Sequence, residues 1–179
     1  MRWFCYVLRN TQEENRTYNG MTNNVEQRIK QHNCDGPQTK GAVYTRTWGR
    51  GCWEYIMILT GDPEVFDKHE ALRCEWRIKK PEGKRRTTKY VGPRNRIKGV
   101  NHAMSLERFT SNCPNTVKDL GLKIWVHEDY VDALDERYYL DIESCTFSSD
   151  DIANIQNYEV GAEIEAEVES DIVELLEVG

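Results

Sequence analysis

The sequence predicts a small α/β (α+β) domain, with a central sheet of about three strands flanked by helices and followed by a C-terminal extension. Three observations lead to this fold class. Short apolar and aromatic runs bounded by turn residues are typical of strands. Between them lie longer segments whose apolar residues recur every three to four positions, as they do on one face of a helix. The chain of 179 residues is also long enough for one compact core and an appendage.

Three central strands are predicted at 3–9, 16–21 and 53–60. The first is a short aromatic run, and the polar residues 11–16 after it are suited to the turn of a hairpin with the second. The third, WEYIMILT, is strongly apolar and ends at a Gly-Asp-Pro turn. A further segment, 122–126, alternates between apolar and polar residues and predicts another strand outside the central three.

The first helix is predicted at 23–33. Asn23 is suited to the N-cap position, and Glu26 stands three residues later, where a capping box places its acid. Arg28 and His32 are four residues apart, so a helix brings both side chains to the same face. The segment therefore predicts a helix that presents a cation and an imidazole side by side.

The second helix is predicted at 63–79. Asp62 is suited to cap it, and Pro63 fits the first turn, where a helix does not need the missing N–H. Leu72 and Trp76 are four residues apart and are expected to face the core. A proline directly after this segment ends the helix.

Charge is distributed unevenly along the chain, whose formal net charge is −6. Residues 1–137 contain 24 Lys and Arg against 18 Asp and Glu, whereas residues 138–179 contain 12 acids and no Lys or Arg. A basic body can attract a polyanion even when the overall pI is low. The acidic tail is consistent with a solubilising segment, a mimic of DNA or a partner-binding segment, and the sequence does not separate these.

The cysteines and the apolar segments indicate an intracellular protein of the nucleus or cytoplasm. None of the six cysteines forms a C-x-x-C pair, which argues against a structural zinc site and favours reduced thiols. No run of about twenty apolar residues predicts a membrane span, and the N-terminus lacks a secretory signal. We therefore expect no membrane association.

Three motifs occur in a fixed order along the N-terminal half. Cys5-Tyr6-Val7 is followed by Tyr18-Asn19-Gly20, then by NNVEQRIKQHN at 23–33, and finally by Glu75 within ALRCEW. In this order and spacing they resemble the GIY-YIG nuclease superfamily, with CYV in place of GIY and YNG in place of YIG. The chain also resembles the Slx1-like branch of structure-specific endonuclease subunits over about residues 1–130. The RING-type zinc domain usual in that branch has no matching cysteine pattern here.

The resemblance implies a domain organisation and a catalytic role for five residues. A GIY-YIG nuclease domain is expected at 1–110, a small extension packed on it at 111–140, and an acidic tail, partly helical or disordered, at 141–179. Independently of the resemblance, the apolar residues Met104, Leu106 and Phe109 predict a third helix at 100–109, within the nuclease domain. The implied catalytic residues are Tyr6, Tyr18, Arg28, His32 and Glu75.

Phosphodiester hydrolysis explains why these residue types are needed. The resemblance implies Glu75 as the ligand of one Mg²⁺ or Mn²⁺ ion, because a single carboxylate suffices for a cation that keeps several waters. Arg28 offers a planar fork of donors to a phosphate. Tyr6 is the implied general base, Tyr18 positions water or phosphate, and His32 bonds a tyrosine hydroxyl or relays a proton. Each of the five residues alone has an ordinary structural explanation, so the nuclease interpretation depends on their ordered combination.

The basic stretch from Arg77 to Lys98, with ten Lys and Arg and one acid, is a candidate track for the phosphate backbone of DNA. Such contacts position DNA without reading its sequence. Tyr90 within it could stack on an unpaired base or pack in the core. The predicted DNA-binding residues are Lys40, Arg46, Lys79, Lys80, Lys84, Arg85, Arg86 and Lys89.

The expected function is that of a metal-dependent DNA endonuclease, structure-specific at branched or flapped DNA in repair or recombination. One alternative is a homing or restriction-type GIY-YIG endonuclease, although no helix-turn-helix or zinc finger is visible to read a sequence. The other is an inactive DNA-binding or interaction protein, which the degenerate first motif favours. DNA is the expected partner, with a protein scaffold as a further one, and the oligomeric state stays open.

Overall fold

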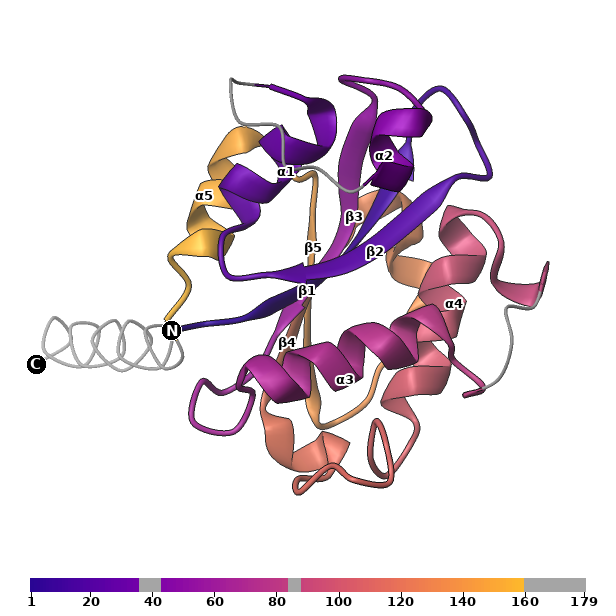
Figure 1. Ribbon diagram of the computed structural model, residues 1–179. Helices are drawn as coiled ribbons and strands as arrows, with labels where there is room; N and C mark the ends of the chain where they lie inside the picture. The colour runs from indigo at the N-terminus through magenta and orange to yellow at the C-terminus, as the bar shows by residue number, and fades with distance from the viewer. Residues whose placement is uncertain (36–42, 84–87, 160–179) are drawn as a thin grey trace, which may run out of the picture.

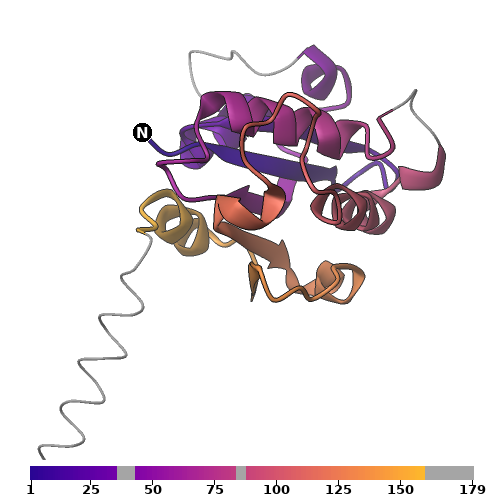
Figure 2. The same ribbon diagram turned by 90° about the horizontal axis from the view of Figure 1, so that it is seen from below.

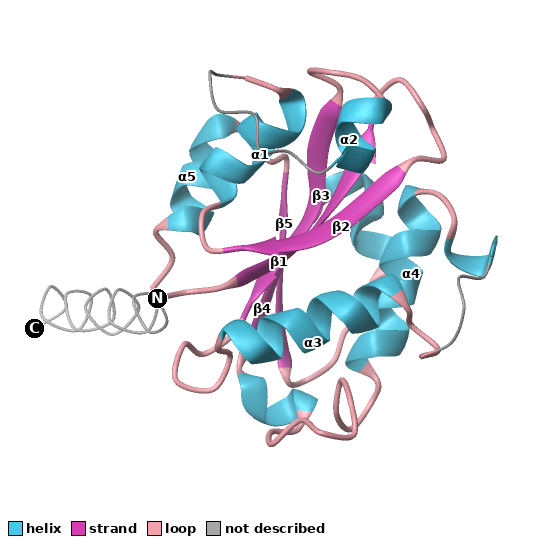
Figure 3. Cartoon of the chain, in the orientation of Figure 1, coloured by secondary structure: helices cyan, strands magenta, loops and turns pink. Residues whose placement is uncertain are grey.

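A computed structural model describes residues 1–35, 43–83 and 88–159 of the chain. In these residues the strands form one five-stranded sheet with the order β2-β1-β3-β4-β5 (Figures 1 and 3). Their bounds are β1 (Phe4–Asn10), β2 (Thr17–Thr22), β3 (Trp53–Thr60), β4 (Leu122–His127) and β5 (Leu140–Cys145). The α/β class is confirmed and the three central strands lie within one residue of their predicted bounds, but the sheet is larger than expected.

The register of the hairpin decides which residues meet near the edge of the sheet. β1 is antiparallel to both β2 and β3, and Tyr6 lies opposite Gly20, with Leu8 opposite Tyr18. Side chains two residues apart on a strand point to the same face. Tyr6 and Tyr18 therefore share one face of the sheet, and β2 is the edge strand beside them.

Helices cover both faces of this sheet. The α-helices are α1 (Val25–Asn33), α2 (Val43–Thr47), α3 (Lys68–Lys79), α4 (Pro93–Met104) and α5 (Ser149–Gln156), and 3₁₀ turns lie at Thr88–Tyr90, Val117–Leu120 and Glu128–Ala133. Buried residues of α3 and α4 pack on the face that contains Cys5 and Val7, whereas α1 and α5 cover the face of Tyr6. Figure 2 shows α3 and α5 on opposite sides of β1.

The first helix begins one residue later than the motif suggests. Asn24, not Asn23, is the N-cap, and its side chain accepts a hydrogen bond from the Gln27 N–H at 2.8 Å. Asn24 keeps an extended backbone because its own N–H donates to the Thr22 hydroxyl at 3.0 Å. Glu26 therefore does not occupy the capping-box position that was predicted for it.

The second helix begins at Lys68, five residues after its predicted start. Asp62 caps an isolated turn, in which its backbone oxygen accepts from the Phe66 N–H at 2.6 Å, and Asp67 caps the helix itself. The predicted core pair is also wrong, because Leu72 is 44% exposed. The buried stripe consists of Ala71, Cys74 and Ile78, which have the small or slender side chains needed for close packing on β1.

The third helix lies at Pro93–Met104 and not at 100–109. Its first turns are basic, which hid its amphipathic pattern, but Ile97, Val100 and Met104 form a buried stripe at helical spacing.

The C-terminal part of the chain also differs from a simple tail. β5 pairs in parallel with β4, and α5 packs on α1, so both complete the domain.

Two further expectations concern thiols and membranes. All six cysteines lie within the described residues and are free thiols. Among the helices of the described residues, none is both long and apolar enough to cross a membrane.

Candidate active site

The hydroxyl of Tyr6 is the centre of a hydrogen-bonded cluster on the α1 face of the sheet. It accepts a hydrogen bond from Arg28 Nε at 2.9 Å and lies 2.8 Å from His32 Nε2. Gly20 lies opposite Tyr6, and a Cβ atom there would stand 2.5 Å from the Tyr6 hydroxyl. Because a Cβ atom at that distance would clash with the hydroxyl, residue 20 must be a glycine for the Tyr6 hydroxyl to lie over β2.

His32 is fully buried and links this cluster to α2. Its Nδ1 lies 2.9 Å from the Thr45 hydroxyl. Burial, assisted by the nearby Arg28 charge, lowers the pKa of His32 to about 3, so the imidazole is neutral near pH 7. These contacts are satisfied when the Tyr6 hydroxyl donates to Nε2 and Nδ1–H donates to Thr45, and equally when Nε2–H donates to Tyr6 and the Thr45 hydroxyl donates to Nδ1.

Arg28 acts on both tyrosines of the cluster. The Tyr18 ring centroid lies 6.3 Å from that of Tyr6 and 4.9 Å from that of His32. Burial raises the pKa of Tyr6 and of Tyr18, and the Arg28 charge and hydrogen bonds oppose this rise. Burial lowers the pKa of Arg28, but the two tyrosines outweigh it and the net pKa is raised. The guanidinium is therefore a permanent cation within the cluster.

Glu75 approaches the tyrosines from the opposite layer, around the edge strand β2. The Asn19 amide donates to the Glu75 backbone oxygen at 3.2 Å and to its carboxylate at 3.3 Å. Burial raises the pKa of Glu75, while Lys79, with Nζ at 3.8 Å, lowers it. The Glu75 charge in turn raises the pKa of Tyr6 and of Tyr18, so Glu75 is close enough to interact electrostatically with both tyrosines.

The donor set near Glu75 suits a hard divalent cation that keeps most of its waters. Among the described residues no cluster of three or more His, Cys, Asp or Glu side chains could enclose a metal ion. Zinc sites generally need three or four such protein ligands, whereas Mg²⁺ is commonly held by one or two carboxylates. The partly desolvated Glu75 carboxylate, with its raised pKa, would also gain from a neighbouring cation.

Asn19 and Thr45 are two members of the cluster that sequence reasoning missed. Asn19 was visible as the middle residue of YNG, but nothing in the sequence indicated that its amide bonds Glu75 across the sheet edge. Thr45 gave no sequence signal, because its contact to His32 depends on the position of α2. The first motif is also corrected, because the tyrosine of GIY is its third letter and Tyr6 is the tyrosine of the cluster. Phe4-Cys5-Tyr6 therefore takes its place, not Cys5-Tyr6-Val7.

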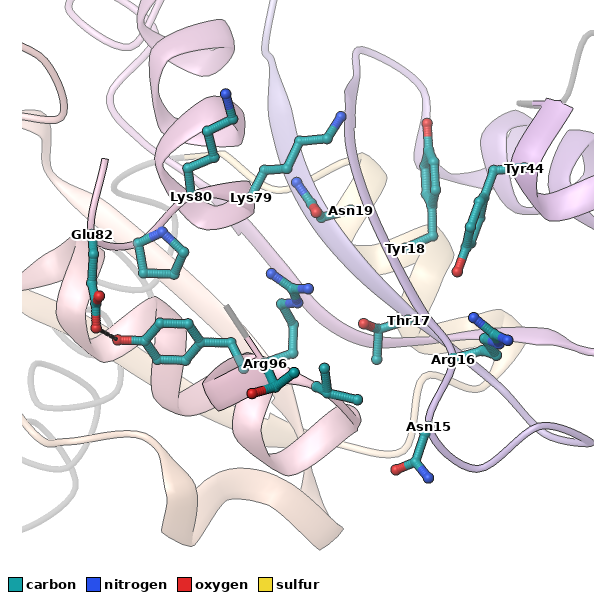
Figure 4. Close-up of a pocket in the computed structure, with 14 residues that line it drawn as sticks. Asn15, Arg16, Thr17, Tyr18, Asn19, Tyr44, Lys79, Lys80, Glu82 and Arg96 are labelled. Carbon is teal, nitrogen blue, oxygen red and sulfur yellow. Dashed lines mark hydrogen bonds between the residues drawn. The ribbon is translucent and has the colours of Figure 1, made fainter. Parts of the chain in front are cut away.

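A cavity of about 410 Å³ opens beside Tyr18, between β2, α2 and the ends of α3 and α4 (Figure 4). Lys79 and Lys80, two of the predicted DNA-binding residues, line it. Tyr90 also lines it but is largely buried, with its hydroxyl bonded to Glu82, so its main role is packing. Of the other predicted contacts, Arg46 is exposed on α2 and Lys89 pairs with Glu82 at 2.9 Å. Lys40, Lys84, Arg85 and Arg86 lie outside the described residues.

Comparison with known proteins agrees with the motif order and the geometry. The GIY-YIG catalytic domain matches residues 2–91, which is half of the chain. The chain belongs to the GIY-YIG catalytic domain family. The match contains Tyr6, Tyr18, Arg28, His32 and Glu75, whereas α4, β4, β5 and α5 lie beyond it.

Several relatives of this GIY-YIG chain share one name, structure-specific endonuclease subunit SLX1. The protein from Rattus norvegicus is 41% identical over 91 residues, which cover 51% of this chain and 31% of that protein. The one from Homo sapiens is 40% identical over 92 residues, or 51% and 30%. A fungal relative from Botryotinia fuckeliana is 35% identical over 104 residues, or 58% and 22%. The chain thus spans a third or less of these relatives, and the Slx1-like resemblance of the domain is confirmed.

Proposed function

We propose that this protein is a divalent-metal-dependent endonuclease that hydrolyses phosphodiester bonds of DNA, with a preference for branched or flapped substrates. One observation carries the proposal. The Tyr6 hydroxyl is held between a permanent cation, Arg28, and a neutral histidine, His32, and it lies within the electrostatic reach of the Glu75 carboxylate. Hydrolysis of a phosphodiester needs this combination of proton acceptor, cationic donor and metal-binding carboxylate.

Tyr6 and His32 form a path for the proton of the attacking water. The water gives a proton to the Tyr6 oxygen while the Tyr6 proton passes to His32 Nε2, so the tyrosine is never left as a free anion. The raised pKa of Tyr6 and the lowered pKa of His32 oppose this transfer. A bound phosphate would counter the Arg28 charge and make His32 a better base.

Arg28 and Glu75 supply the remaining functions. The Arg28 guanidinium donates hydrogen bonds to the phosphate and stabilises the charge that grows on its oxygens in the transition state. Glu75 would hold Mg²⁺ or Mn²⁺, oriented by the Asn19 amide. When bound, such an ion supplies Lewis-acid polarisation of the phosphate and stabilises the leaving oxygen.

The degenerate first motif does not favour the alternative of an inactive DNA-binding protein. Cys5 points away from the tyrosines, and its thiol donates to the Ala71 backbone oxygen at 3.1 Å on the opposite layer. A cysteine there is compatible with packing against α3 and leaves Tyr6 in place. We further propose DNA repair or recombination in the nucleus or cytoplasm as the setting, with a protein scaffold as a partner, in line with the relatives named as endonuclease subunits.

The test is cleavage of labelled DNA by the full chain with Mg²⁺, Mn²⁺ or EDTA. The substrates are a plain duplex, a 5′ flap, a replication fork and a four-way junction. We expect metal-dependent cleavage of the branched substrates, reduced at least about a hundredfold in Tyr6→Phe and Glu75→Gln. Tyr138→Phe and Glu64→Gln, which alter exposed side chains outside the cluster, are matched controls that should cleave normally.

Two outcomes would change the conclusion. Cleavage of plain duplex at one sequence would favour a homing or restriction-type enzyme. Salt-sensitive binding without cleavage of any substrate in either metal would contradict the enzymatic proposal and favour a DNA-binding protein.

A further inference from the structure

The cavity beside Tyr18 is next to the catalytic cluster but is not part of it. Its walls come from β2, from Tyr44 of α2, from Lys79 and Lys80 at the end of α3, and from Arg96 of α4 (Figure 4). Tyr18 is shared, because one side of its ring faces His32 and the cavity lies beside it. A ligand in the cavity would therefore be a direct neighbour of the scissile phosphate.

The charge of the lining favours an anion. Four cationic side chains line the cavity, from Arg16, Lys79, Lys80 and Arg96, against one acid, Glu82. The Glu82 carboxylate already accepts hydrogen bonds from Lys89 and Tyr90. The excess of cations is suited to the phosphates of a nucleic acid strand.

The cavity also has flat apolar surfaces at its end near α2. The rings of Tyr44 and Tyr18 are nearly parallel, with an interplanar angle of 26° and centroids 6.1 Å apart. The Arg16 guanidinium carbon lies 3.6 Å from the centroid of the Trp48 ring, in a cation–π contact. Tyr44 is half-buried, so part of its ring is accessible from the cavity. Aromatic faces beside a basic groove are the features with which proteins bind single strands.

The size of the cavity separates an unpaired nucleotide from a duplex. A volume of about 410 Å³ lies within the range of small-molecule sites. A paired base keeps both faces covered by its neighbours in the stack and cannot rest on a tyrosine. An unpaired base is free to do so, and every base offers a π face for stacking.

We propose that this cavity binds one unpaired nucleotide of the single strand that leaves a DNA branch. Its base stacks on Tyr44, and its phosphates contact Lys79, Lys80 and Arg96. The inference rests on the proposed nuclease function and gives it a physical basis for preferring branched DNA. Lys79 connects the two sites, because its Nζ lies 3.8 Å from the Glu75 carboxylate.

The test measures binding of two single-stranded probes to the full chain in EDTA, by fluorescence anisotropy. One probe is octathymidylate, and the other is an abasic phosphodiester of the same length. Tyr44→Leu should weaken octathymidylate binding about tenfold and leave abasic binding unchanged, because stacking is lost. Tyr44→Trp should retain octathymidylate binding, which separates stacking from damage to the fold. Lys80→Gln should weaken both probes and lower the salt dependence by about 0.7 in the log–log slope.

Matched controls and one separate measurement keep the two proposals distinguishable. Tyr138→Leu and Lys68→Gln change exposed residues away from the cavity and should bind both probes as the unaltered chain does. If the unaltered chain cleaves a 5′ flap but Tyr44→Leu binds octathymidylate normally, the cavity proposal is wrong and the nuclease function stands. If Tyr44→Leu and Lys80→Gln behave as expected but no substrate is cleaved, the cavity proposal stands and the nuclease function fails.

Discussion

Tyr6 combines two properties that a single residue rarely has, because it is both a core residue and the proposed proton acceptor. Its side chain has no exposed surface, and its ring meets that of Tyr55 edge-on at 5.5 Å. Its hydroxyl is nevertheless reached by polar groups from α1 across the gap that Gly20 leaves. Rigid packing of the ring thus holds the hydroxyl in one position, as precise acid–base chemistry requires.

The neutral state of His32 predicts how stability depends on pH. The pKa of His32 is about 3 in the folded chain against about 6.5 for an unperturbed histidine. The unfolded state therefore binds a proton more readily between these values. The contribution of His32 to the free energy of unfolding is fully present above pH 6.5 and falls as the pH drops toward 3, by up to about 1.4 kcal/mol per pH unit.

Urea denaturation at pH 7, 6 and 5 checks this expectation. His32→Gln is less stable at pH 7 because it loses contacts to Tyr6 and Thr45, but its stability should fall less steeply toward pH 5 than that of the unaltered chain. An equal slope in both proteins would show that His32 is not the residue responsible.

At the same scale, the sequence could predict the identity of the proposed catalytic side chains but not their supporting contacts. Tyr6, Arg28 and His32 were recognisable because motif order and helical spacing place them together. Asn19 and Thr45 were not, because each depends on how separate elements pack. Contacts between elements have no local sequence pattern, which explains why the supporting groups were missed.

Among the elements, α1 depends on the distant helix α5 for its N-terminal cap. Asn24 satisfies the Gln27 N–H, while the Gln156 side chain accepts from the Val25 N–H at 2.7 Å. The first N–H groups of a helix have no partner within the helix, so a neighbour that accepts from them stabilises it. Ile155, beside Gln156, is buried in the core cluster of Tyr6 and Val25. α5 thereby positions the helix that carries Arg28 and His32.

Gln156→Ala tests this dependence. Loss of the hydrogen bond should lower the free energy of unfolding by about 1 kcal/mol and speed hydrogen exchange at the Val25 amide. Gln156→Glu keeps an acceptor and adds a negative charge at the N-terminus of α1, so it should restore stability. Asn154→Ala, an exposed position on the same helix, is the matched control. Unchanged exchange at Val25 in Gln156→Ala would contradict the capping role.

The elements also show where local patterns suffice and where they fail. The first and third central strands were predictable because each is a short apolar run bounded by turn residues, and the second followed as the hairpin partner of the first. α4 was displaced in the prediction because its basic residues obscured a stripe that becomes visible only when Ile97 and Val100 are known to be buried. β5 was missed although Leu140 and Ile142 alternate with acidic residues, because the segment was taken as the start of the acidic tail.

For the whole molecule, the domain that folds is longer than the part that matches the family. The match ends at residue 91, yet β4 and β5 complete the sheet, and the nearly buried Lys123 joins them through Asp141 at 2.9 Å and Glu143 at 3.0 Å. Phe147, after β5, packs against Tyr55 at 6.0 Å, and Tyr55 in turn packs against Tyr6. Residues beyond the match thus contribute to the core beneath the candidate site.

Charge at the scale of the whole molecule leads to a last prediction. Residues 160–179 contain seven acidic side chains and no Lys or Arg, so a chain that ends at residue 159 has a net charge of +1 instead of −6. Repulsion between the acidic segment and DNA opposes binding at long range, and salt screens it within about 10 Å at 0.1 M. The shortened chain should therefore bind a DNA fork several-fold more tightly at 50 mM salt and almost equally at 300 mM, as measured by anisotropy in EDTA.

A full-length chain in which the seven acids are replaced by glutamine separates charge from length. If electrostatic repulsion is the cause, this variant should bind as the shortened chain does, with the same convergence at high salt. Tighter binding that persists at 300 mM salt would instead point to a segment that occupies the basic face directly, since short contacts are screened less than distant ones. Weaker binding after either change would contradict both explanations and would assign the acidic segment a role in holding the DNA-binding face together.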